Sequence, residues 1–95
     1  MNSDFMTEYS DRFAQRVIQE SGPSSLEQAQ TAWRIAFGSS PTADQETQLK
    51  AFIDSQEAAL EASPQGEDKP GDPRHEALKT TCRALLASNG YLYID

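Results

Sequence analysis

The chain has 95 residues, 24% of them charged, and carries a formal net charge of −7 at pH 7, values that suit one ordinary globular domain. Its acidity argues against nucleic acid and anionic lipid as main partners, because both attract basic surfaces. A single cysteine rules out an internal disulfide, no apolar run approaches the ~18 residues of a membrane-spanning helix, and the charged N-terminal stretch does not resemble a signal peptide.

The first predicted helix runs from about residue 4 to residue 21. Asn2, Ser3 and Asp4 are candidate N-cap residues, and Gly22-Pro23 is a helix-stop signal. Opposite charges four residues apart are expected on its wet side. Its buried side is expected to consist of apolar residues at helical spacing, namely Phe5, Tyr9, Phe13 and Val17, with Met6 and Ala14 beside them.

The second predicted helix spans residues 25–37. Ser24 or Ser25 is its expected cap, with Glu27 or Gln28 as the reciprocal partner. Trp33 is the only tryptophan of the chain, and a side chain of this size dominates the core it joins. The rest of the expected buried stripe is formed by Leu26, Ala29, Ala36 and Phe37, with Ile35 on one flank.

Residues 38–42 are expected to end this helix and begin the next. Gly38 suits the left-handed C′ position, and Pro41 disfavours helix in the residue before it. Thr42 is the expected N-cap of a capping box with Gln45. The glycine and two serines before a helix are also compatible with anion binding, but a phosphate-binding loop needs a further glycine and a lysine. A loop and a cap are therefore the preferred interpretation.

The third predicted helix covers residues 43–63, with Leu49, Phe52, Ile53 and Leu60 on one face. Residues 64–73 hold three prolines, two glycines and no large apolar residue, which predicts a mobile loop. The acidic residues expected to stay in water on this helix are Asp44, Glu46, Asp54, Glu57 and Glu61, together with Lys50.

The fourth predicted helix covers residues 74–88, and the alternating apolar tail after it is expected to pack back on the helices. Leu78, Cys82, Leu85 and Leu86 form its apolar stripe, and Asn89-Gly90 ends it. The predicted fold is therefore all-α, a four-helix bundle-like domain with a long third connection and a short packed C-terminal tail.

No residue of the chain points to catalysis. The only histidine, His75, is expected to be a solvent-exposed helix residue, because a zinc site needs several ligands. Cys82 is expected to pack in the core like a small apolar residue.

No metal or cofactor is expected either. Glu67, Asp68 and Asp72 do not follow the ligand spacing of a calcium loop, which needs a bidentate glutamate at its twelfth position. They are expected to belong to a solvated loop. The residues expected to matter for structure or interaction are Trp33, Phe37, Gly38, Pro41, Thr42, Tyr91 and Tyr93.

Several short motifs in order resemble a known family. They are Trp33-Arg34-Ile35-Ala36-Phe37-Gly38, then Pro41-Thr42, then an acidic helix, and finally Cys82-Arg83-Ala84-Leu85-Leu86-Ala87-Ser88-Asn89 before the apolar tail. This order resembles the C-terminal end of a domain-of-unknown-function family of planctomycete proteins, often found with c-type cytochrome domains. Two positions depart from the family pattern, because Ser39 stands where arginine is usual and Gly90 where glutamate is usual.

The resemblance implies a part of a larger exported protein, in the periplasm or at the cell surface, and the haem motif of its relatives is absent here. The preferred interpretation is a non-catalytic helical module that supports or docks against other domains of its parent, with no nucleic acid, membrane insertion or metal. Two alternatives stay open: a fragment of an enzyme completed by upstream sequence, and a free-standing acidic adaptor for a basic protein.

Overall fold

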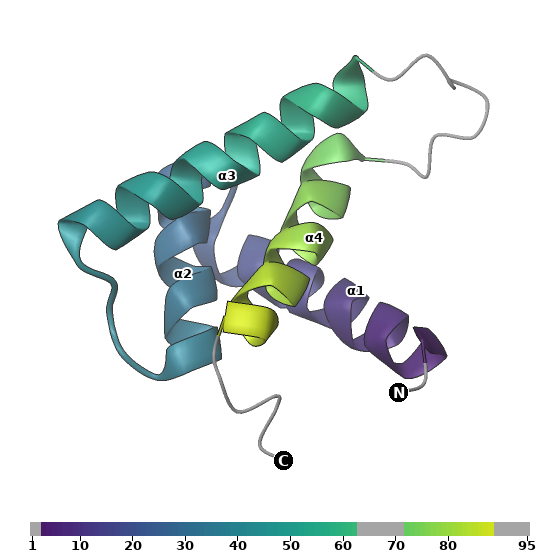
Figure 1. Cartoon of the computed structure of the whole chain (residues 1–95), viewed down its shortest axis with the longest axis horizontal. Coiled ribbons are helices and arrows are strands. Elements are labelled where there is room, and N and C mark those ends of the chain that lie inside the picture. The colour runs from purple at the N-terminus through teal and green to yellow at the C-terminus, as the bar shows by residue number, and fades with distance from the viewer. Residues whose placement is uncertain (1–2, 63–71, 89–95) are drawn as a thin grey trace.

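The computed structural model of the chain describes residues 3–62 and 72–88, and within them it contains four helices and no strand (Figure 1). The helices are α1 (Ser3–Ser21), α2 (Ser25–Phe37), α3 (Ala43–Glu61) and α4 (Pro73–Ser88). The predicted all-α, four-helix bundle-like class is confirmed. Most of the expected mobile loop 64–73 and the whole expected packed tail lie outside the described residues.

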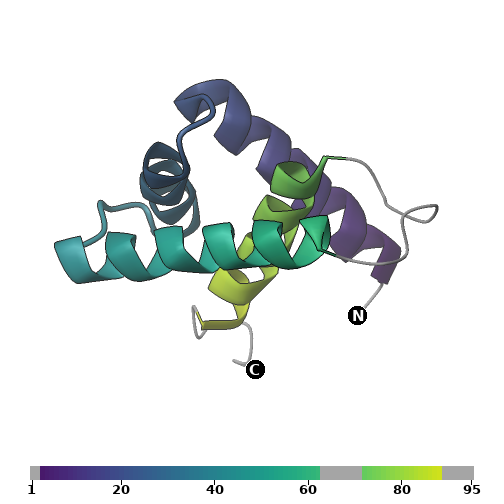
Figure 2. The same ribbon diagram turned by 90° about the horizontal axis from the view of Figure 1, so that it is seen from above.

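Helix α4 is the central element of the fold. It lies between α3 and α1 and packs most extensively against these two helices, while α2 packs against α3 and α1 at one end of the molecule (Figures 1 and 2). A helix that packs against two neighbours in this way buries a wide stripe of its surface. Accordingly, α4 buries the largest set in the described chain, consisting of Ala77, Leu78, Thr81, Cys82 and Leu85.

The helix ends follow the predicted signals. Ser24 accepts a hydrogen bond from the backbone N–H of Glu27 at the start of α2. Gly38, with φ of 79°, ends the helix in the left-handed conformation, and its N–H donates to the Arg34 carbonyl. Thr42 and Gln45 form both hydrogen bonds of a capping box, 3.1 and 2.9 Å long, at the start of α3.

The core confirms part of the expected stripes. Phe13, Ala14 and Val17 of α1 are buried as predicted, but Tyr9 is 41% exposed, because the first turns of α1 extend beyond the other helices (Figure 1). The buried cluster consists of Phe13, Ala14, Val17, Ala29, Ala32, Leu49, Ile53, Leu78, Cys82 and Leu85.

The predicted stripe of α2 is confirmed in part, because Ala29 is fully buried and Ala36 is partly buried against the core. Leu26 is 37% exposed, and Trp33 and Phe37 are only partly buried against the core. The buried face instead consists of two alanines and two polar residues, Gln28, Ala29, Thr31 and Ala32. Polar side chains can be buried where they are hydrogen-bonded, so hydrophobicity alone does not predict that Gln28 and Thr31 belong to the buried face.

Polar side chains tie the first turn of α4 to every other helix. The Arg74 guanidinium donates to Glu57 of α3 at 2.6 Å, to Gln28 Oε1 of α2 at 2.8 Å and to the Pro23 carbonyl at 3.0 Å. The expected exposed position of His75 is wrong, because its side chain is only 21% exposed and its Nε2 lies 2.7 Å from Asp11 Oδ1 of α1. The two adjacent residues thus fix how α4 sits in the bundle.

Candidate docking groove

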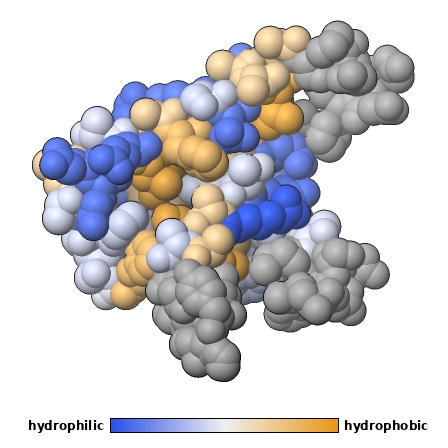
Figure 3. All heavy atoms as spheres, viewed as in Figure 1, coloured by the Kyte–Doolittle hydropathy of each residue, from blue (hydrophilic) through white to orange (hydrophobic). Residues whose placement is uncertain are grey.

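An open groove of about 430 Å³ lies between α2, α3 and α4. Apolar residues gather on the face of the molecule that carries it (Figure 3). Its size falls in the ~300–1,000 Å³ range of ligand-binding pockets. The lining residues are Trp33 of α2, then Gln45, Gln48, Leu49 and Phe52 of α3, and Ala84, Leu85 and Ser88 of α4.

Helical spacing explains why these side chains meet. Gln45, Gln48, Leu49 and Phe52 stand at positions i, i+3, i+4 and i+7 of α3, which share one face of a helix. The capping box fixes where this face begins, because it sets the first turn of α3. The α4 wall follows the same rule, since Ala84 and Ser88 are four residues apart.

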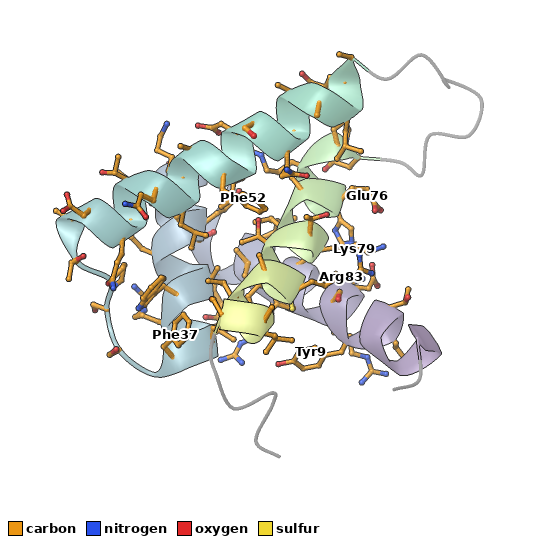
Figure 4. All side chains as sticks on the ribbon, viewed as in Figure 1. Tyr9, Phe37, Phe52, Glu76, Lys79 and Arg83 are labelled. Atoms are coloured by element: carbon orange, nitrogen blue, oxygen red, sulfur yellow. The ribbon has the colours of Figure 1, made fainter. Side chains whose placement is uncertain are left out.

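Two aromatic rings, those of Trp33 and Phe52, line the groove. The rings of Trp33 and Phe37 pack at a centroid distance of 4.4 Å with a tilt of 46°, so Phe37 supports the indole from behind. Phe52 extends from α3 toward α4 (Figure 4). The rings of Trp33, Phe37 and Phe52 are only partly buried, although the large area of an aromatic side chain stabilises a contact that buries it.

The rim of the groove is polar and uncharged. Gln45, Gln48 and Ser88 supply amide and hydroxyl groups, and none of the eight lining residues carries a charge. The Ser88 hydroxyl donates to the Leu85 carbonyl at 3.1 Å, which fixes it beside the buried leucine. Protein–protein contacts usually have an apolar centre that is depleted of charged residues and a polar rim.

The predicted interaction residues have different places in this arrangement. Trp33 lines the groove and Phe37 packs on it. Gly38, Pro41 and Thr42 belong to the connection between α2 and α3, where they end one helix and begin the next. Tyr91 and Tyr93 lie outside the described residues.

Seven of the eight lining residues are not among the predicted interaction residues. Leu49, Phe52 and Leu85 are predicted only as members of apolar helix faces, and the other four, Gln45, Gln48, Ala84 and Ser88, belong to no predicted site or apolar stripe. Their only signal in the sequence is helical spacing from Leu49, Phe52 and Leu85. That spacing shows that they share a face with core residues, but it does not show which neighbouring helix leaves the face open.

A second cavity of about 270 Å³ lies beside Arg74 and is lined by Ile18, Pro23, Gln28, Glu57, Asp72 and Arg74. The Arg74 guanidinium in this cavity is already paired with the Glu57 carboxylate, so its charge is balanced within the chain. The pair serves to position α4. The hydrogen bond from His75 holds the pKa of the Asp11 carboxyl below its ordinary value. The Asp11–His75 pair likewise joins two helices, α1 and α4.

The single cysteine is a core residue, as predicted. Cys82 is free and fully buried, and burial raises the pKa of its thiol to about 11 although Ser10 hydrogen-bonds it. A protonated buried thiol is a poor nucleophile. Within residues 3–62 and 72–88, no three His, Cys, Asp or Glu residues gather that could bind a metal ion, and no helix has the length and apolarity to cross a bilayer. Glu67 and Asp68 lie outside this part of the chain.

Comparison with protein-family models, with curated proteins and with solved structures found no match to the chain. The planctomycete resemblance therefore stays a prediction.

Proposed function

We propose that this chain is a non-catalytic helical docking module, and that its groove between α2, α3 and α4 receives an apolar segment of another domain of a larger parent protein. The observation that carries the proposal is an open, uncharged groove lined by two half-buried aromatic rings, Trp33 and Phe52, with Phe37 packed on the Trp33 indole. Aromatic side chains, tryptophan among them, are enriched at the energetic centre of protein interfaces.

The chemistry of the groove defines the segment that fits it. Its centre should carry an aromatic and an aliphatic side chain to cover Trp33, Leu49 and Phe52. Its flanks should carry lysine or arginine, because the chain has a net charge of −7 and opposite charge speeds and orients association. The location in an exported parent protein is part of the proposal and is supported by the motif order from Trp33 to Ser88.

A selection from a random peptide library against the full chain tests this proposal. We expect the enriched peptides to combine aromatic and aliphatic residues with basic flanks, and to shift the fluorescence of Trp33, the only tryptophan. Ala84→Arg places a long side chain at the exposed edge of the groove, so it should weaken binding by about tenfold or more, which is about 1.4 kcal/mol.

The matched control is Ala58→Arg, an identical substitution at an exposed position of α3 away from the groove. It should leave affinity unchanged. The proposal is wrong if no peptide is enriched, or if the enriched peptides bind the Ala84→Arg and Ala58→Arg variants equally well.

A further inference from the structure

We propose that the chain carries its own groove ligand, namely residues 91–94, which compete in cis with an incoming partner segment. This inference rests on the proposed use of the groove as a docking site. Its first support is position: Ser88 is the last described residue of α4 and is itself part of the groove wall.

Reach is the second support. Only Asn89 and Gly90 separate Ser88 from Tyr91, and three residues span at most about 10 Å. A glycine two residues beyond the helix permits the sharp reversal that a return along α4 requires. Tyr91 can therefore reach the groove without any change in the helices.

Composition is the third support. The sequence Tyr91-Leu92-Tyr93-Ile94 alternates aromatic and aliphatic residues, so an extended segment places both tyrosines on one face. Tyrosine needs apolar contact for its ring and a hydrogen-bond partner for its hydroxyl. The groove offers both, with Leu49 and Phe52 in its floor and Gln48 on its rim.

Nuclear Overhauser effects in the isotope-labelled full chain test the cis contact. We expect cross-peaks between the ring protons of Tyr91 or Tyr93 and the methyl groups of Leu49 and Leu85. The cross-peaks should disappear in Ala84→Arg and persist in Ala58→Arg. Their absence from the unmodified chain overturns the inference, as does their appearance between differently labelled copies in a mixed sample, which would show exchange between two molecules.

Competition is the second measurement. In the full chain with Tyr91→Ser and Tyr93→Ser, the peptides selected above should bind about tenfold more tightly, the factor expected when the tail leaves about a tenth of the grooves free. If the peptides bind this variant and the unmodified chain with the same affinity, the tail does not compete for the groove.

The two proposals fail in different ways. Cross-peaks without any peptide binding would leave the cis contact standing and refute docking. Peptide binding that depends on the groove, without cross-peaks, would support docking and refute the cis contact.

Discussion

Arg74 is the residue on which the helix arrangement depends most. Its guanidinium joins α4 to α3, to α2 and to the connection before α2, and its side chain is only 21% exposed. Arg74→Met should lower the free energy of unfolding by about 2–3 kcal/mol, because hydrogen bonds to charged groups are lost and Glu57 is left unpaired. Urea unfolding followed by circular dichroism measures the loss.

Arg12→Met is the control for this substitution. Arg12 pairs with Glu8 on α1, but the two side chains are 75% and 66% exposed, and such surface pairs contribute less than about 1 kcal/mol. Equal losses for the two variants would show that Arg74 acts only as a surface charge.

Asp11 makes the stability of the fold depend on pH. Because the hydrogen bond from His75 lowers its pKa in the folded chain, Asp11 stabilises the fold above the unfolded pKa of about 3.9. This contribution is lost as the pH falls through the lowered folded value. The stability difference between the unmodified chain and Asp11→Ala should therefore shrink below about pH 4. Urea midpoints at several pH values measure it, and a His75→Gln background should remove most of the effect.

At the scale of the elements, Gly38 sets the backbone geometry at the end of α2, where the connection to α3 begins. Its φ is 79°, and a β-carbon placed on it would meet no atom within 4 Å. Gly38→Ala should therefore cost about 1–2 kcal/mol from backbone conformation alone. Gly38→Asn should cost less, because asparagine tolerates this region better. Thermal unfolding compares the two, and an asparagine variant as unstable as the alanine variant would contradict a conformational cause.

The sequence predicts elements well because their signals are local. The caps at Ser24, Thr42 and Gly38 involve residues three or four positions apart, and the structure confirms them. The burial of Gln28 in α2 is not predicted, because its Oε1 accepts from Arg74, which lies 46 positions away, while its Nε2 donates to the Gly22 carbonyl. His75 was misplaced for the same reason, since its partner Asp11 lies 64 positions away.

The groove is even harder to predict from the sequence than the burial of α2. Its floor could be predicted as the apolar face of residues 49–53, since that face follows from periodicity. Its existence could not, because a groove depends on the distance between α2 and α4 across α3. No local pattern encodes the angle at which helices cross.

At the scale of the whole molecule, Cys82 reports on global opening. It lies in α4, the helix between α1 and α3, and its thiol is fully buried with a pKa raised to about 11. A thiol reagent should therefore label the folded chain only as fast as it unfolds, and label the chain in urea at once. Rapid labelling under native conditions would show that α4 opens by itself.

The central place of α4 also bears on how the chain is made. A ribosome produces α1 first, yet Val17 and its neighbours are covered by a helix that is synthesised more than fifty residues later. The nascent α1, α2 and α3 therefore expose apolar surface until residues 73–88 emerge, and the native arrangement forms only after translation of the described helices is complete.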